Sequence, residues 1–212
     1  MTIELINVKP AYMSEDEISS SDIYLQDTLR FEKNKKYLIK AASGRGKTSL
    51  LNFIYGSNLN FDGQILYQDS PLKGQSLFDL RRAQISYVFQ ELKLFSDLSL
   101  IENIQLKNAI THHKTTHEVD VLLNRLNLSF KRESSAKTLS LGQKQRVAII
   151  RALCQPFEFL LLDEPFSHLD DKNSKIMAHI IQEESDRQQA GLILTSLGNE
   201  PERFDYDFIL NL

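Results

Sequence analysis

Hydrophobic and polar residues alternate in short runs over the first forty positions of the chain. The runs IELINV (3–8) and IYLQDTLRFE (23–32) are separated by the polar stretch MSEDEISSSD. Alternation with a period of two puts one row of side chains in a core and the other in solvent, which is typical of half-buried strands. The pattern predicts antiparallel strands joined by an exposed loop, with a further short strand over 37–40.

From position 48 onwards the pattern changes several times. It predicts a helix over 48–55 that ends near Gly56, a hairpin in DGQILYQDSPL and a strand in ISYVFQ. Helical periodicity prevails from 91 to 153, where Thr115 and Glu118 form a capping box ahead of an apolar helix face. Beyond Cys154, the apolar strands FEFLLLD, GLILTS and DFILNL alternate with a helix over 171–189.

Buried strands that alternate with helices are typical of a parallel α/β core. We therefore expect a single domain over 1–212. In this domain, 1–90 and 154–212 form an α/β core that includes an antiparallel β subdomain. The segment 91–153 is expected to be an inserted helical subdomain.

Composition narrows the class of protein but does not identify it. The chain has 212 residues, of which 42% are hydrophobic and 25% charged, and its net charge is −3. A slightly acidic chain has no general attraction for nucleic acid, so no nucleic-acid partner is expected. Cys154 is the single cysteine, which favours a reducing cytoplasm. The chain shows no secretion signal and no apolar run near the ~20 residues of a membrane span.

The junction between the strand at 37–40 and the next helix reads AASGRGKTSL, which nearly fits the phosphate-loop pattern G-x-x-x-x-G-K-[ST]. Such a loop directs backbone N–H groups at phosphate oxygens, and the helix adds its positive end. Ala41 stands where the first glycine belongs, and the alternative is a small-residue turn without a ligand. The predicted phosphate contacts are Ala41, Ala42, Ser43, Gly44, Arg45, Gly46, Lys47, Thr48 and Ser49.

Two carboxylates stand at the end of the apolar strand in the segment FLLLDEP (159–165). Asp163 at the end of this strand could hold Mg²⁺ together with the hydroxyl of Thr48. Glu164 is placed to polarise a water for attack on a γ-phosphate, with Lys47 neutralising charge. An acidic pair that merely caps the next turn is the simpler alternative, but the phosphate loop makes it the weaker one.

The segment LSLGQKQRVAIIRAL (139–153) resembles the LSGGQ signature and following helix of the ATP-binding cassette (ABC) family. The resemblance covers essentially the whole chain, and ISYVFQELKLFSDLSLIENI is most similar to lipoprotein-releasing, macrolide-exporting and cell-division ATPases. It implies a P-loop NTPase core with a RecA-like parallel sheet. It also implies that Ser140, Gly142 and Gln143 close over ATP bound by an opposite subunit.

Other positions carry over from the same resemblance. Gln90 matches the glutamine that reaches Mg²⁺ and couples the site to the helical subdomain, and SHLD (167–170) matches a loop that contacts the other subunit. Tyr12 matches the aromatic that stacks on adenine, although Tyr24 competes for this role. The implied cofactors are ATP and Mg²⁺.

The chain departs from the family pattern at three positions, namely Ala41, Leu141 and Ser196. Ser196 follows the strand LILT, where family members carry a histidine near the γ-phosphate, so slow hydrolysis by the isolated protein is expected. The cluster HHKTTH (112–117) offers two histidines four positions apart. It lacks an evident third metal ligand, so we expect a solvated loop and first helical turn there.

The resemblance implies an ATP-hydrolysing subunit that dimerises around Mg-ATP, with itself or with a second cassette chain, and drives an integral membrane partner. The partner is expected near Gln90 and the segment after it. Localisation would be cytoplasmic and peripheral to the membrane. Because of Ser196, an ATP-gated clamp with slow or no turnover is the alternative. A cassette protein acting on DNA or ribosomes is the third.

Overall fold

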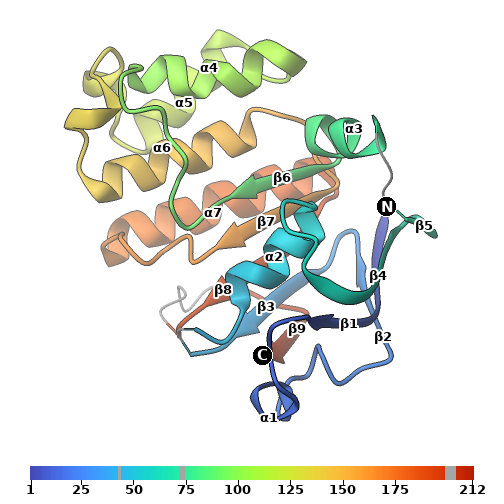
Figure 1. The fold of residues 1–212 in the computed structure, drawn as a ribbon. Helices are drawn as coiled ribbons and strands as arrows, with labels where there is room; N and C mark the ends of the chain where they lie inside the picture. The colour runs from blue at the N-terminus through green and yellow to red at the C-terminus, as the bar shows by residue number, and fades with distance from the viewer. Residues whose placement is uncertain (43, 72–74, 199–203) are drawn as a thin grey trace.

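A five-stranded parallel sheet forms the centre of the molecule in the computed structural model, which describes residues 1–42, 44–71, 75–198 and 204–212 (Figure 1). The strand order is β6-β7-β8-β3-β9, and all neighbouring pairs are parallel. The strands are β3 (Lys36–Lys40), β6 (Ile85–Val88), β7 (Phe159–Asp163), β8 (Gly191–Ser196) and β9 (Phe208–Asn211). This is the parallel core that the apolar runs predict.

Side chains of the central strands are divided between two hydrophobic cores. Leu160 and Leu162 belong to the core shared with the helices within residues 100–188, whereas Phe159 and Leu161 belong to the core shared with α2 (Lys47–Tyr55). All five residues of β7 are buried. A parallel sheet that is covered on both faces requires such continuous apolar strands.

A smaller antiparallel sheet packs beside the parallel one, in the order β2-β1-β4-β5. Its strands are β1 (Thr2–Pro10), β2 (Thr28–Glu32), β4 (Phe61–Tyr67) and β5 (Ser70–Pro71). The expected antiparallel pairing is confirmed, because β1 pairs with both β2 and β4 and β4 pairs with β5. This sheet and α2 share the second core.

Two local expectations for the first ninety residues were wrong, and one helix was not foreseen. Residues 23–27 do not extend the strand, because Ile23 and Tyr24 are buried in a turn whose N–H groups both donate to Ser21 Oγ. The polar loop contains the short helix α1 (Glu15–Ile18), and a nine-residue helix, α3 (Gln75–Ala83), precedes β6. Burial of Leu80 anchors α3, a tertiary effect that the short apolar pattern does not reveal.

The helical segment consists of α4 (Leu100–Thr111), α5 (Thr116–Arg125), two short 3-10 helices (Ser129–Lys131 and Ala136–Thr138) and α6 (Leu141–Leu153). Ser99, Thr115 and Ser140 begin α4, α5 and α6, each with a capping box. These helices share one core with α7 (Asp171–Gln188) and with one face of the sheet. Figure 1 shows α4 and α5 above α6, with α7 between α6 and the sheet.

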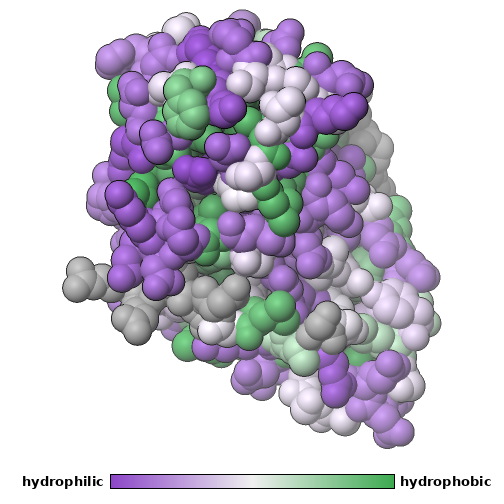
Figure 2. Space-filling view, turned by 90° about the vertical axis from the view of Figure 1, so that its left-hand side faces the viewer, coloured by the Kyte–Doolittle hydropathy of each residue, from purple (hydrophilic) through white to green (hydrophobic). Residues whose placement is uncertain are grey.

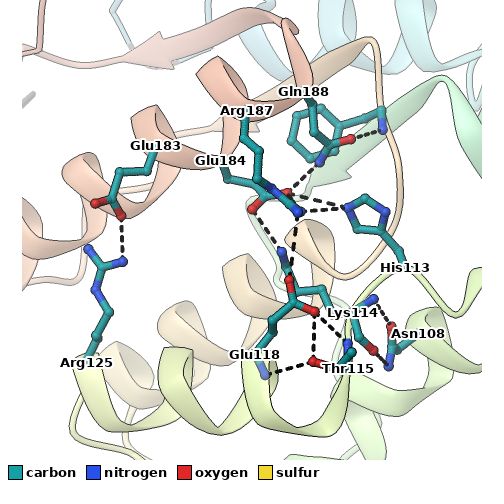
Figure 3. Close-up of polar contacts among 11 residues, drawn as sticks. Asn108, His113, Lys114, Thr115, Glu118, Arg125, Glu183, Glu184, Arg187 and Gln188 are labelled. Atoms are coloured by element: carbon teal, nitrogen blue, oxygen red, sulfur yellow. Dashed lines mark hydrogen bonds and ion pairs between the residues drawn. The ribbon is translucent and has the colours of Figure 1, made fainter.

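The expectation of a solvated loop and first helical turn for HHKTTH (112–117) is confirmed at His112, Thr115, Thr116 and His117, which are exposed, but it is wrong for Lys114. Lys114 is buried, and its Nζ lies 2.9 Å from Glu184 Oε2 on α7 (Figure 3). Arg187 Nη2 donates to Glu184 Oε1 at 2.7 Å, and His113 Nε2 lies 3.5 Å from the same oxygen. A buried ion-pair network therefore ties the start of α5 to α7.

None of the helices in the described parts of the chain is both long enough and apolar enough to cross a membrane.

Candidate nucleotide site

The loop between β3 and α2 lies at the carboxyl edge of the parallel sheet. Gly44 and Gly46 have φ values of 81° and 90°, a left-handed conformation that favours glycine. Ala41 is not among the described residues with positive φ, so its methyl group costs the loop little. Ser43, a predicted phosphate contact, lies outside the described residues. Arg45 is exposed, and its guanidinium donates to the Glu17 carbonyl at 3.3 Å.

The Lys47 ammonium is enclosed by this loop and by a carboxylate. Its Nζ donates to the carbonyls of Ala41 at 2.7 Å and Ala42 at 3.1 Å, and it lies 3.4 Å from Glu164 Oε1. Only 5% of Lys47 is exposed. The loop therefore holds a buried positive charge at the start of α2, where the helix end also favours anions.

Asp163 and Glu164 are held by a residue that the sequence analysis did not single out. Thr195 Oγ1 donates to Asp163 Oδ1 at 2.7 Å and accepts from the Glu164 N–H at 3.1 Å. Glu164 has φ of 49°, so its backbone is left-handed. Thr195 and Asp163 are paired in register across β7 and β8, which places them side by side. The sequence signal that could have pointed to Thr195 is a polar residue near the end of the otherwise apolar strand β8.

The oxygens of Thr48, Gln90 and Asp163 suit a hard divalent cation. Thr48 Oγ1 donates to Gln90 Oε1 at 3.2 Å. Asp163 is fully buried, and its Oδ2 has no hydrogen-bond partner among the described residues. Burial raises the pKa of Asp163 above its usual range, against the opposing effects of Thr48, Thr195 and Lys47. Mg²⁺ prefers oxygen ligands, so this donor set fits it.

A pocket of about 240 Å³ connects these groups, and its lining includes Tyr12, Met13, Gly46, Lys47, Thr48, Ser49, Gln90 and Glu164. Tyr12 is half exposed, and its hydroxyl bonds with Ser49 Oγ. Tyr24 is 1% exposed and belongs to the core. Of the two competing tyrosines, only Tyr12 therefore has a ring face open to a ligand.

The signature segment begins α6 with a complete capping box. Gln143 N–H donates to Ser140 Oγ at 3.3 Å, and Ser140 N–H donates to Gln143 Oε1 at 2.9 Å. A Cβ on Gly142 would lie 2.8 Å from the His168 carbonyl oxygen, so a side chain there has no room. Leu141 is 51% exposed at the first turn of this helix.

A second contact joins the signature helix to the loop after Glu164. Gln145 is buried, and its Nε2 donates to the Pro165 carbonyl at 3.0 Å. Ser167 Oγ donates to the Glu164 carbonyl at 3.0 Å. Gln145 therefore ties α6 to the loop after Glu164, and it is a further residue that the sequence analysis did not single out.

Ser196 ends β8 and is 3% exposed. Its hydroxyl oxygen accepts from the Gly198 N–H at 2.9 Å, and Ser196 is not part of the lining of the nucleotide pocket.

Figure 2 shows the face of the molecule that forms the left-hand side of Figure 1. Hydrophilic residues dominate this face, and separate hydrophobic patches interrupt them.

Comparisons with known proteins identify the family. The profile of the family described as ABC transporter matches residues 25–167. HrtA of Staphylococcus aureus (strain MRSA252), provisionally named a hemin import ATP-binding protein, is 33% identical over 170 residues, covering 77% of each chain. An uncharacterized ABC transporter ATP-binding protein, YclH of Bacillus subtilis (strain 168), is 29% identical over 181 residues, covering 84% of this chain and 80% of YclH.

A solved structure has the same fold. The dimeric structure of MJ0796, described as a bacterial ABC transporter cassette, superposes with a TM-score of 0.81 at 24% identity and covers 99% of this chain and 94% of that chain. The family match, the two relatives and the shared fold agree with the loop, the acidic strand and the signature described above. The chain belongs to the ABC transporter family, as an ATP-binding and ATP-hydrolysing subunit.

Proposed function

We propose specific roles for the residues that the fold brings to the carboxyl edge of the sheet. The placement of Lys47 carries the proposal, because a buried ammonium faces both the loop carbonyls and Glu164. In this assignment Lys47 leaves the carbonyls of Ala41 and Ala42 to bind the β- and γ-phosphates of ATP. The N–H groups of residues 41–49 surround the same phosphates, and Tyr12 stacks on adenine.

In the proposed reaction, Glu164 orients a water in line with the γ-phosphorus and takes its proton. The water oxygen bonds to the γ-phosphorus as the bond from that atom to the β–γ bridging oxygen breaks, releasing ADP. Thr195 supports this step by holding the Glu164 backbone through its N–H. Mg²⁺ held by Thr48, Gln90 and Asp163 would supply charge neutralisation on the phosphates.

We further propose that two cassettes close on ATP, with Ser140, Gly142 and Gln143 of one chain against the nucleotide of the other. Support comes from the exposed first turn of α6, where Leu141 is 51% exposed, and from the dimeric arrangement of MJ0796. The pairing chain is a second copy or a different cassette. The chain acts as one domain in which 91–153 moves as a helical subdomain, joined to the site through Gln90.

The proposed partner is an integral membrane subunit that holds the protein at the cytoplasmic face of the membrane. It is expected to contact the segment after Gln90 and α4. The ABC transporter family, and the relative CbiO1, which is described as part of the complex CbiONQ, support this proposal. No role with nucleic acid is proposed.

Sedimentation velocity of the Glu164→Gln variant tests whether two copies of the chain close on ATP. This substitution keeps the side-chain shape but removes the proton acceptor, so the variant should dimerise in saturating Mg-ATP and remain monomeric in ADP. A variant that stays monomeric in Mg-ATP contradicts self-pairing. Addition of a second cassette chain from the same genome then tests mixed pairing.

A further inference from the structure

His168 is an exposed side chain on the loop that connects β7 to α7. The same loop begins with Glu164, and Ser167 joins the two positions because its hydroxyl donates to the Glu164 carbonyl at 3.0 Å. Histidine is the side chain that most often moves or donates a proton near neutral pH. An exposed histidine four positions after the proposed water-orienting carboxylate is therefore a candidate for a further part in the reaction.

The Nδ1 atom of His168 faces two hydrogen-bond acceptors. It lies 3.0 Å from Ser167 Oγ, whose own hydrogen is donated to the Glu164 carbonyl. It also lies 3.4 Å from Gln145 Oε1, which is the acceptor end of an amide whose Nε2 donates to the Pro165 carbonyl. Because neither partner has a hydrogen to give to the ring, we assign a proton to Nδ1, which donates.

The other ring nitrogen, Nε2, lies on a different edge of the imidazole from these partners. It makes no hydrogen bond with the residues that the structure describes. Gln145 is 1% exposed, so it holds the ring from the interior side of the loop. One edge of the His168 ring is therefore fixed by the protein, and the other edge is open to an incoming group.

The backbone of His168 lies against the start of α6. A Cβ on Gly142 would lie 2.8 Å from the His168 carbonyl oxygen and 3.8 Å from Leu169 Cδ2. The proposed function places Ser140, Gly142 and Gln143 against the nucleotide of a second chain. An exposed side chain directly beside Gly142 belongs to the same closing face. His168 is not in the described lining of the pocket for the chain's own nucleotide.

That pocket supplies few cations for a triphosphate. In its described lining, Lys47 is the only Lys, Arg or His. Ser196 stands where family members carry a histidine near the γ-phosphate, and it is outside the same lining. Charge on a transferring phosphoryl group is stabilised by cations, and in some phosphoryl-transfer enzymes a second chain supplies one of them.

We propose that His168 of one chain donates a hydrogen bond from Nε2 to the γ-phosphate of the ATP bound by a second copy of this chain. The inference rests on the proposed function, because it requires two chains that close on ATP. Nδ1 keeps its proton on Ser167 and Gln145, and Nε2 takes up a second proton from solvent. The resulting imidazolium donates to an anionic oxygen, which is a charge-assisted hydrogen bond.

His168 thus performs part of the work that the family gives to a histidine at the position of Ser196. It makes and breaks no bond of ATP, so Glu164 keeps its proposed part in the reaction. The contact forms only while two chains are closed. The isolated chain therefore keeps the low turnover expected from Ser196, and His168 accounts for a part of the rate that remains.

Two substitutions at His168 separate the functions of its two nitrogens. His168→Asn keeps an amide donor beside Ser167 and Gln145, but it has no atom at the place of Nε2. His168→Gln extends an amide donor to the place of Nε2. In a single-turnover assay with saturating protein, His168→Asn should hydrolyse ATP about a hundredfold more slowly than the wild type, and His168→Gln should stay within about tenfold. The reverse order would show that the ring only stabilises its loop, and would overturn the proposal.

Two mixed dimers test whether His168 acts on the ATP of the other chain. Glu164→Gln stops hydrolysis in one chain and is added in large excess, so that the reactive chain is held in mixed dimers. The first dimer pairs His168→Asn with Glu164→Gln, and the second pairs the wild type with the double variant Glu164→Gln/His168→Asn. The first should hydrolyse its reactive ATP about a hundredfold faster than the second, because only there does this ATP face an intact His168 on the opposite chain.

The other outcomes distinguish this proposal from the proposed function. A slower first dimer would place His168 at the nucleotide of its own chain, and equal rates would remove it from the reaction. Either result overturns the proposal while the closing of two chains stands. Absence of mixed dimers in sedimentation with Mg-ATP overturns both the self-pairing and this proposal. Calorimetry should show equal ATP affinity for His168→Asn and the wild type, because the lining of the nucleotide pocket is unchanged.

Discussion

Lys47 Nζ lies 3.4 Å from Glu164 Oε1, so the proposed phosphate-binding cation and the proposed water-orienting carboxylate form an ion pair. Both side chains are largely buried, with 5% and 10% of their surfaces exposed. An ATP γ-phosphate would separate them, because the phosphate offers Lys47 a stronger partner than the loop carbonyls. The nucleotide is therefore expected to rearrange this pair as it binds.

Lys47→Ala should weaken Mg-ATP binding by at least about a hundredfold, because it removes a charge-assisted contact to the phosphates from a buried site. Titration calorimetry measures the affinity directly. Ala41→Gly is the matched control, since position 41 does not require positive φ, and its affinity should remain close to that of the wild type. Equal binding by Lys47→Ala and the wild type would refute the site assignment.

Ser196→His should raise the turnover of the isolated protein, whose rate is expected to be low. A histidine could donate to the γ-phosphate, and loss of one such donor typically costs about 10²–10³ in rate. ATP affinity should change little. Steady-state phosphate release measures the rate, and thermal melting checks that the buried position accepts the larger ring.

Ser196→Ala is the companion variant for the same residue. The serine hydroxyl accepts from Gly198 N–H, so its removal should affect the loop but not the turnover. A wild-type rate already within the ordinary enzyme range of ~1–10³ per second would contradict this interpretation of Ser196.

Gly142→Ala should slow turnover by roughly tenfold or more while the protein still folds and binds ATP. A Cβ at this position would lie 2.8 Å from the His168 carbonyl, so the start of α6 and the loop after Glu164 must separate. Small displacements of catalytic groups carry large rate penalties. Phosphate release measures the turnover, and calorimetry measures the ATP affinity. An ATP affinity that falls in parallel with the turnover would contradict the prediction, because it would place the defect in nucleotide binding.

Glu184→Gln should destabilise the protein by about 3 kcal/mol at neutral pH, because it leaves Lys114 buried without its counter-charge. The double variant with Lys114→Met should recover much of this loss. Chemical denaturation of the single and double variants gives the coupling free energy. A coupling near zero would show that the pair contributes nothing beyond packing.

The carboxylate of Glu184 should also make the free energy of unfolding depend on pH. Burial would raise the pKa of Glu184, but hydrogen bonds from Arg187 and Lys114 lower it below its usual value. A lowered folded-state pKa gives stability that is complete above the unfolded pKa of about 4.3 and is lost as the pH falls through the folded pKa. As the pH is lowered through this range, the unfolding free energy of Glu184→Gln should fall less steeply than that of the wild type. Chemical denaturation at a series of acidic pH values measures both slopes.

The sequence by itself predicted the parallel core, the antiparallel sheet and the helical segment. Strands such as FLLLD and GLILT are apolar up to their last residue because both faces of the sheet are covered, and a capping box in the sequence marks the start of α5. The phosphate loop, the acidic pair and the signature could also be recognised in the sequence, since the residues of each motif are contiguous in the chain. Their assigned chemical roles stay predictions.

Only the tertiary structure decided the rest. Thr195 meets Asp163 and Glu164 because β7 and β8 are neighbours, a pairing between residues far apart in sequence. Lys114 is buried because α7 supplies Glu184, so one residue of a largely exposed polar segment became part of the interior. The choice between Tyr12 and Tyr24 also depended on burial. Local patterns report a residue's chemistry and its immediate neighbours, whereas burial and long-range partners arise only when the whole chain packs.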